Sequence, residues 1–270
     1  MEQDTFRARF AEKEIVWLTL INKGYLPYCL NFLRSMAQCH AAFTLIVFCL
    51  DKDTMLALQD EPLCYCIYAD FIIEKNKKLA LATDLKHWGQ LEYKRIVFAK
   101  LDAIQYTLQH LVQGWSAVKY VGYIDTDIWL FKDPTPIVLA LANANPTVPV
   151  FAQCDEACGA CSNRTQCPNL CSGVFVLRNW RTLAPLLDYK DSEVAVSMSD
   201  QHYIAAKFKH FHIQTLTFDK RLIQNGAIPG LKERKLPLPL HPGCCLLHFN
   251  YLVGADKQRV MALQGFWHEL

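Results

Sequence analysis

Short apolar segments alternate along the first half of the chain with segments whose apolar residues recur at helical spacing. Nearly uninterrupted apolar runs cover residues 15–20, 43–50, 66–73 and 118–124. Runs of this kind are typical of strands that are buried on both faces of a sheet. Helical spacing covers residues 26–37 and 92–111. The pattern predicts an α/β fold with a mostly parallel sheet and right-handed crossovers.

Beyond Pro134 the pattern is less regular. Further strands are expected at residues 151–153, 173–177 and 245–249, and helices at residues 199–208 and around 260–263. A short helix is expected to begin at Met55, with Thr54 as its N-terminal cap. No repeat or low-complexity segment divides the chain. We therefore expect a single domain over residues 1–270, with one half up to about residue 135 and the other from about 136.

Composition and charge narrow the setting of this domain. The 270 residues are 52% hydrophobic, which is enough for a substantial buried core. A net charge of +2 gives no sign of a surface built to bind nucleic acid. Residues 1–14 lack the apolar core of a signal peptide, and the run at 43–50 is too short to cross a bilayer. We expect a soluble, cytoplasmic protein without a membrane span.

Two carboxylates follow the predicted strand at residues 118–124. They belong to the segment Asp125-Thr126-Asp127. Ligands of open α/β sheets bind beyond the carboxyl ends of the strands, and these residues stand at such an end. Paired carboxylates suit Mn²⁺ or Mg²⁺ and leave coordination positions for phosphate oxygens. The alternative is an ordinary solvated acidic turn.

A third metal ligand is expected near the C-terminus, where His248 lies at the end of the last predicted strand. A neutral imidazole suits Mn²⁺ better than it suits a harder ion. Gly254 would let backbone amides approach a phosphate closely, and Lys257 would add a positive charge there. The alternative is a buried structural histidine, followed by a glycine turn and a solvated lysine.

These pieces together resemble the nucleotide-diphospho-sugar transferases of the GT-A fold. Glycogenin-like enzymes pair Asp-x-Asp with a late His-x-x-Gly-x-x-Lys. In this chain five residues, rather than two, separate His248 from Gly254. This departure leaves the metal role of His248 better supported than the phosphate contacts of Gly254 and Lys257.

Further segments resemble a narrower group, glycosyltransferase family 77 and its relatives in plants, protists and large DNA viruses. They occur in the family's order and span most of the chain: Thr19–Tyr25, Leu30–Leu33, Tyr123–Asp127, Lys132–Pro134, Cys171–Phe175 and Asp200-Gln201. The resemblance implies a single GT-A domain, with a nucleotide-binding half to about residue 135 and a sugar and acceptor half beyond it. A viral protein acting in the cytosol of a host cell is one setting that it implies.

The same resemblance implies an activity and its cofactors. Asp125, Asp127 and His248 would hold Mn²⁺ or Mg²⁺. The enzyme would move a sugar, with retention of configuration, from a nucleotide-diphosphate donor to a hydroxyl of a glycan, protein or small-molecule acceptor. UDP-sugars are favoured as donors, with GDP-sugars open.

The resemblance also assigns roles to other residues. Contacts to the donor are implied for Thr19, Lys100, Asp125, Ser172, Gly173, Gly254 and Lys257. Asp200 and Gln201 would lie near the anomeric carbon as the catalytic residues. The alternatives are a solvated helix lysine for Lys100 and a helix cap for Asp200.

Five of the twelve cysteines cluster between Cys154 and Cys171. The thiolates of Cys158, Cys161, Cys167 and Cys171 would suit a structural, tetrahedral Zn²⁺ site. Two disulfides and free thiols are the alternatives.

Two other functions compete with sugar transfer. One is a non-catalytic nucleotide-sugar-binding or interaction module with a zinc loop. The other is a haloacid-dehalogenase-type phosphatase, which also uses Asp-x-Asp but expects Thr or Val two residues after the second Asp. Trp129 occupies that position here.

Overall fold

The computed structural model describes residues 2–75, 90–155, 169–226, 231, 238 and 240–267, with the backbone alone for residues 2–5. In the first part of the chain the elements are α1 (Glu2–Phe10), β1 (Ile15–Ile21), η1 (Lys23–Tyr25), α2 (Leu26–Gln38), β2 (Leu45–Cys49), α3 (Lys52–Leu58), β3 (Cys64–Tyr68), α4 (Asp70–Lys75), α5 (Leu91–Tyr106), η3 (Thr107–Leu111) and β4 (Tyr120–Ile124).

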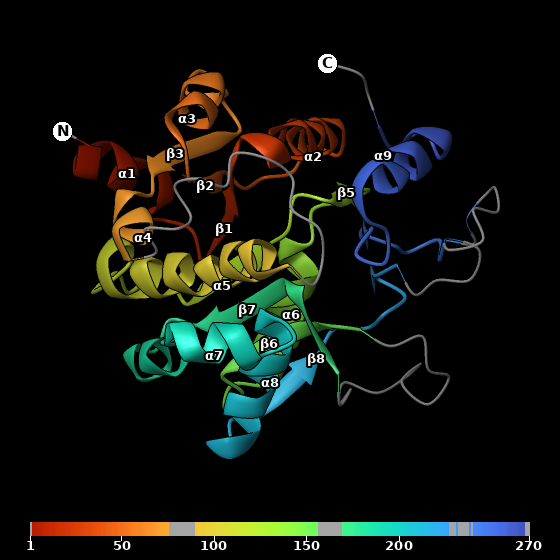
Figure 1. Cartoon of the computed structure of the whole chain (residues 1–270). Coiled ribbons are helices and arrows are strands. Elements are labelled where there is room, and N and C mark those ends of the chain that lie inside the picture. Colours follow the sequence, from red (N-terminus) through yellow and green to blue (C-terminus); the bar gives the residue numbers. More distant parts are fainter. Residues whose placement is uncertain are drawn as a thin grey trace. The chain divides into compact units, whose positions relative to one another are not determined.

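The elements that follow are β5 (Ile128–Leu130), α6 (Thr135–Ala144), β6 (Val150–Cys154), β7 (Leu170–Arg178), η5 (Arg181–Leu187), α7 (Asp191–Val196), α8 (Asp200–His210), β8 (Thr215–Thr217), β9 (Ile223–Gln224), β10 (Leu246–His248) and α9 (Gly254–Leu263). Strands form a seven-stranded sheet of order β3-β2-β1-β4-β7-β6-β8 and a three-stranded sheet of order β5-β10-β9 (Figure 1). The predicted α/β fold is confirmed.

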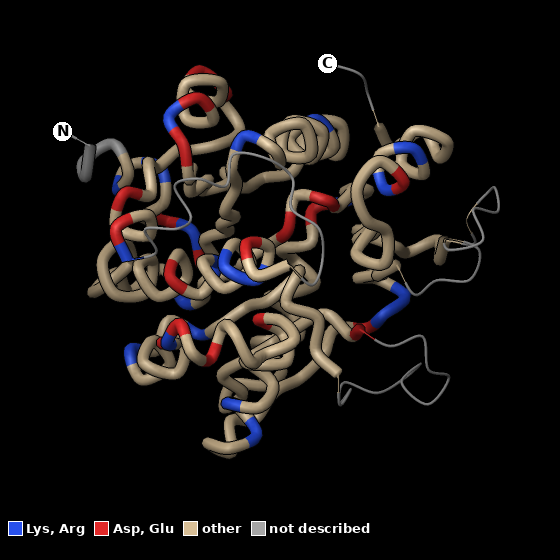
Figure 2. The backbone as a smooth tube through the Cα atoms, viewed as in Figure 1, with Lys and Arg blue, Asp and Glu red and all other residues tan. Residues whose placement is uncertain are grey.

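The chain divides into two compact units, each built from separate segments. The first comprises Met1–Leu26, Phe43–Ile124 and Val176–Ile213, and the second comprises Pro27–Ala42, Asp125–Phe175 and Gln214–Leu270. The expected division into halves near residue 135 stays a prediction. Lysine and arginine positions are interspersed with aspartate and glutamate positions along the described elements (Figure 2).

The first unit is organised around β1, which is buried along its whole length. It pairs in parallel with β2 and β4, and β2 pairs in parallel with β3. In the β1–β4 register Trp17 lies opposite Gly122, and a Cβ on Gly122 would lie 2.6 Å from the Trp17 ring. Glycine at 122 therefore makes room for an indole in the core. Helix α5 packs against β1 and β4.

The second unit contains three strand pairs. β6 pairs in parallel with β8, and β10 pairs antiparallel with β5 and in parallel with β9. β5, β6 and β10 are buried throughout. The antiparallel register places His248 opposite Ile128, the first residue of β5.

Two local expectations are wrong. The apolar run at residues 66–73 is not one strand, because β3 ends at Tyr68 and α4 begins at Asp70. An apolar run without clear alternation fits a buried strand and a buried helix equally well. Helix α3 begins at Lys52 rather than Met55, and its cap is Asp51, whose carboxylate accepts a hydrogen bond from the Thr54 amide at 2.8 Å.

Among the helices that the structure describes, none combines the length and the hydropathy needed to cross a membrane.

Candidate metal centre and active site

Asp125 and Asp127 stand in the turn between β4 and β5. The amide of Asp125 donates a hydrogen bond to the Gly173 carbonyl at 2.8 Å, and the Asp127 carbonyl accepts one from the Phe249 amide at 2.9 Å. Both ends of the turn are thus held by backbone contacts from distant segments. Because β5 runs antiparallel to β10, the turn lies beside the end of β10, where His248 projects.

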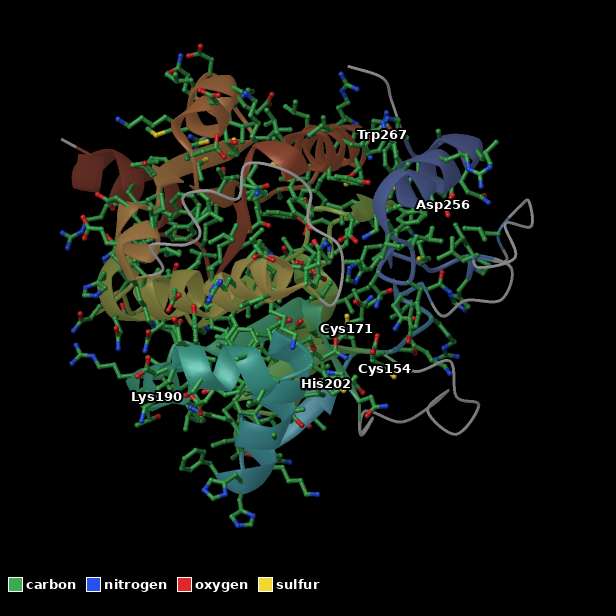
Figure 3. All side chains as sticks on the ribbon, viewed as in Figure 1. Cys154, Cys171, Lys190, His202, Asp256 and Trp267 are labelled. Atoms are coloured by element: carbon green, nitrogen blue, oxygen red, sulfur yellow. The ribbon has the colours of Figure 1, made fainter. Side chains whose placement is uncertain are left out.

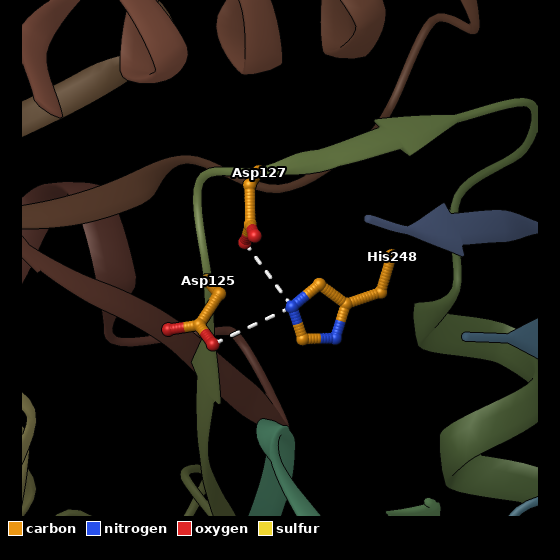
Figure 4. Close-up of side chains that lie close together, drawn as sticks. All are labelled: Asp125, Asp127 and His248. Carbon is orange, nitrogen blue, oxygen red and sulfur yellow. Dashed lines mark ion pairs between the residues drawn. The ribbon is translucent and has the colours of Figure 1, made fainter. Parts of the chain in front are cut away.

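The three predicted ligands meet in space (Figure 4). Nε2 of His248 lies 3.1 Å from Oδ1 of Asp127 and 3.6 Å from Oδ2 of Asp125. The candidate ligand atoms all lie within 4.8 Å of one another. The His248 side chain is 2% exposed, whereas that of Asp125 is 28% exposed. The imidazole therefore lies on the buried side of the cluster, and the Asp125 carboxylate lies on the side that solvent can reach.

Lys257 contributes a positive charge to this cluster. Its ammonium forms an ion pair with Oδ2 of Asp127. Burial would raise the pKa of the Asp127 carboxyl, but Lys257 and His248 hold it well below its usual range. Burial would lower the pKa of His248, but the charge of Asp127 and the neighbouring Cys171 raise it to about 10.

The chemistry of the donor set fits a divalent ion. Two carboxylates and one imidazole offer oxygen and nitrogen donors of the kind that Mn²⁺ accepts, and Mg²⁺ tolerates with less preference for the nitrogen. An ion that bound His248 would displace the proton from Nε2, because imidazole binds metals in its neutral form. Of the residues that the structure describes, only Asp125, Asp127 and His248 form a cluster of this kind.

Gly254 and Lys257 lie in the first turns of α9. Gly254 has φ of +56°, a left-handed conformation that favours glycine, so its backbone position accounts for the residue type. The Lys257 side chain is 16% exposed and paired, so the alternative of a solvated lysine is wrong. Contact with a phosphate stays a prediction for both residues.

Ser172 and Gly173 lie within β7, and Ser172 is buried. Gly173 is in close contact with the candidate ligands. A Cβ at this position would lie 2.1 Å from Cε1 of His248 and 2.8 Å from Oδ2 of Asp125. Only a residue without a side chain lets β7 pass this close to the cluster.

Lys100 and Asp200 form a buried ion pair in the first unit. Nζ of Lys100 lies 3.0 Å from Oδ2 of Asp200, and each side chain is 5% exposed. The ammonium also lies 4.9 Å from the centre of the Tyr123 ring. Ser199 caps α8, so the readings of Lys100 as solvated and of Asp200 as the helix cap are both wrong. Gln201 follows on α8 and is half-buried.

Thr19 is buried in β1, and its register partner on β2 is Val47. The Thr19 hydroxyl has no hydrogen-bond partner among the described residues. A buried hydroxyl without a partner is uncommon in folded proteins. A role for Thr19 in donor binding stays a prediction.

Two residues contact His248 on its other side: Gln153, which the sequence analysis did not single out, and Cys171, which it assigned only to the zinc hypothesis. Oε1 of Gln153 lies 2.9 Å from Nδ1 of His248, and Sγ of Cys171 lies 3.7 Å from the same nitrogen. The available signal was Gln153 itself, a polar residue inside the apolar run of β6, since a buried amide needs partners.

The zinc hypothesis concerns residues that lie mostly outside the described part of the chain. Cys158, Cys161 and Cys167 fall there. Cys171 lies at the start of β7 and Cys154 at the end of β6, which neighbours β7 in the sheet (Figure 3), and both residues are buried. Burial raises the pKa of the Cys171 thiol. Zinc binding, disulfides and free thiols all stay open for the cluster.

Comparison with known proteins gives a structural match only. No protein-family model and no curated protein matches the sequence. Mouse xyloside xylosyltransferase 1 is similar in structure, with a TM-score of 0.54 at 12% identity over 89% of this chain and 99% of that one. An active-site mutant of LgtC has a TM-score of 0.53 at 10% identity, and the match covers 94% of this chain and 96% of that one. A glycosyltransferase involved in glycosylation of the major capsid of PBCV-1 has a TM-score of 0.50 at 10% identity, and the match covers 92% of this chain and 98% of that one.

Similarity at these identities establishes the fold. The chain has the GT-A fold of these glycosyltransferases, and the predicted fold class is confirmed. The narrower likeness to family 77 stays a prediction.

Proposed function

We propose that this protein is a metal-dependent glycosyltransferase that uses a nucleotide-diphosphate sugar. The observation that carries the proposal is the convergence of Asp125, Asp127 and His248 at the carboxyl end of β4 in a GT-A fold. The similar structures include a xylosyltransferase and a capsid glycosyltransferase, which supports sugar transfer in general.

We assign the cluster to Mn²⁺ or Mg²⁺. When bound, the ion would serve as a Lewis acid toward the donor diphosphate and offset charge on the departing nucleotide. The two aspartates would supply negative charge for the ion, and His248 would hold it from the buried side. Lys257 now pairs with Asp127. A bound ion would neutralise that carboxylate instead, so we expect the Lys257 ammonium to become available to a phosphate oxygen.

The remaining roles follow from the resemblance. We assign Thr19 to the base and ribose, Ser172 and Gly173 to the sugar, and Gly254 to the diphosphate. Asp200 and Gln201 would face the anomeric carbon, and Lys100, which pairs with Asp200 inside the protein, would face the donor. We favour a UDP-sugar as donor and retention of configuration, with a hydroxyl of a glycan, protein or small molecule as acceptor.

A panel of UDP- and GDP-sugars tests the proposal. Purified protein is incubated with each donor and Mn²⁺, and release of the nucleotide is measured with water as the acceptor. We expect release from at least one donor and loss of release with EDTA, restored by excess Mn²⁺. Thermal unfolding with each donor separates two outcomes: stabilisation without turnover supports the non-catalytic binding module, and neither stabilisation nor turnover with any donor contradicts the proposal.

The phosphatase alternative is disfavoured by the fold and by the ligands. A phosphatase of that type would use Asp125 as a nucleophile with a small residue where buried Trp129 stands in β5. It would have no use for His248 beside both carboxylates. Hydrolysis of p-nitrophenyl phosphate is the control, and we expect none.

A further inference from the structure

A chain of hydrogen bonds fixes the orientation of the Gln153 side chain behind His248. Gln153 is fully buried in β6. Its Nε2 donates a hydrogen bond to the backbone carbonyl of Gln224 at 2.8 Å. A carbonyl can only accept, so the amide nitrogen must face Gln224. The amide oxygen therefore faces His248, with Oε1 at 2.9 Å from Nδ1.

This orientation determines which ring nitrogen carries a proton. An amide oxygen only accepts hydrogen bonds, so the contact at 2.9 Å requires a proton on Nδ1. In a neutral imidazole the other nitrogen then holds the lone pair. That nitrogen is Nε2, which faces Asp127 at 3.1 Å and Asp125 at 3.6 Å. The tautomer with Nδ1–H is the one that can bind an ion between the carboxylates.

Cys171 is the other neighbour of Nδ1, and it is the weaker one. Its sulfur lies 3.7 Å from Nδ1 and accepts a hydrogen bond from Nδ2 of Asn250 at 3.6 Å. The orientation of the Asn250 amide is fixed in turn, because its Oδ1 accepts from the Gly226 amide at 2.8 Å. Sulfur is a weak acceptor, so the Nδ1 proton is bound mainly by Gln153. The contact with Cys171 is also compatible with a proton on Nδ1.

We propose that Gln153 is a positioning residue, which holds His248 in the Nδ1–H tautomer and so presents Nε2 to a divalent ion. The inference rests on the proposed function, since it supposes that the cluster binds a metal. Partners that orient metal-bound histidines in this way affect metal affinity by roughly 10- to 100-fold. Gln153 thus belongs to the metal centre although it is placed to touch neither ion nor sugar.

The test measures Mn²⁺ binding directly, without turnover, by the electron paramagnetic resonance signal of free Mn²⁺. Gln153→Met keeps the length of the side chain and removes the acceptor. Gln224→Met is the matched control, because the Gln224 side-chain oxygen is buried without a hydrogen-bond partner among the described residues and its backbone carbonyl is unaffected. Circular dichroism confirms that each variant is folded.

We expect Gln153→Met to weaken Mn²⁺ binding at least tenfold, with Gln224→Met staying within about threefold of the wild type. Equal affinity of wild type and folded Gln153→Met would overturn the inference while leaving the metal site in place. Should Gln153→Met fail to fold, the imidazole signals of the wild type decide, since they report the tautomer of His248 without any substitution. No Mn²⁺ binding by the wild type would refute the metal proposal itself, and this inference with it.

The imidazole nitrogen signals give an independent readout. In protein labelled with ¹⁵N-histidine and loaded with diamagnetic Mg²⁺, we expect His248 to show a slowly exchanging proton on Nδ1. A proton on Nε2 in the loaded protein would contradict the assigned tautomer.

Discussion

The imidazole of His248 occupies the space that a side chain at position 173 would need. A Cβ on Gly173 would lie 2.1 Å from Cε1 and 2.7 Å from Nδ1 of the ring. Both residues are set by strands, Gly173 by β7 and His248 by β10. Both the close approach of β7 and the position of His248 therefore require glycine at position 173.

Gly173→Ala is expected to displace His248 from the cluster. Overpacking of this kind costs about 1–3 kcal/mol of folding stability. We also expect Mn²⁺ binding to fall more than about tenfold, because a histidine loses its geometry when the residues that support it move. Denaturant unfolding and Mn²⁺ titration measure the two effects. Gly243→Ala is the control, since its added Cβ would meet only side-chain atoms, at 3.2 Å or more; a similar loss there would contradict the specific clash.

Asp127→Asn is expected to lower the rate of donor turnover by roughly 100-fold or more, a loss comparable to removing one transition-state-stabilising group. The amide keeps the size of the carboxylate but lacks the charge that pairs with Lys257 and His248. Steady-state nucleotide release at saturating Mn²⁺ measures the effect. Asp256→Asn on the exposed start of α9 is the matched control. Wild-type turnover in folded Asp127→Asn would count against the metal assignment.

Lys100→Met is expected to destabilise the fold by about 3–5 kcal/mol, because it leaves the buried Asp200 carboxylate without a counter-charge. The double variant Lys100→Met/Asp200→Leu should regain most of that stability, since no charge then remains buried. Lys94→Met, on the same helix and half-buried, should change stability by less than about 1 kcal/mol. Urea unfolding gives all three values.

The same double variant separates structure from chemistry. If Asp200 acts on the sugar, as proposed, the variant regains stability without regaining donor turnover. Recovery of both would remove Asp200 from the list of catalytic residues.

Cys66 is expected to be the most reactive thiol of those that the structure describes. Hydrogen bonds from the thiols of Cys49 and Cys64 lower its pKa, Arg9 lowers it further, and burial opposes both without overcoming them. Cys64 Sγ lies 3.7 Å from Cys66 Sγ. Because the thiolate is the nucleophile, a lowered pKa makes the reaction rate nearly independent of pH between 6 and 8. An ordinary thiol would instead slow about tenfold for each pH unit below its pKa.

Iodoacetamide labelling followed by peptide mass spectrometry measures this difference. Cys244, whose pKa burial raises to about 12, is the internal control and should remain unlabelled. A rate at Cys66 that rises tenfold per pH unit would contradict the prediction.

The central strands and the metal ligands could be predicted from the sequence because each leaves a local signal. A strand buried on both faces is an apolar run, as in β1 and β2, and carboxylates directly after such a run mark the edge where ligands bind. Helix α4, which contains Phe71, could not be told from a strand, because a short apolar run is compatible with either a buried helix or a buried strand.

The remaining parts of the site depend on contacts between distant segments. Lys100 lies on the apolar face of α5, but nothing near it in sequence reveals that Asp200 is its partner. Gln153 could be flagged as a buried amide, but its link to His248 arises only when β6 and β10 have folded. Interactions of this kind are set by tertiary structure and are absent from local patterns.

The pairing of β5 with β10 also fixes the order in which the metal ligands can come together. Leu130 lies opposite Leu246, so a long stretch of chain must be synthesised and closed before His248 reaches the aspartates. A nascent chain that ends before β10 carries both carboxylates but lacks His248. Contacts between such distant segments form late and slowly. A divalent ion could therefore be bound by all three ligands only after β10 has paired with β5. Such an ion would stabilise only the chains in which that pairing has formed.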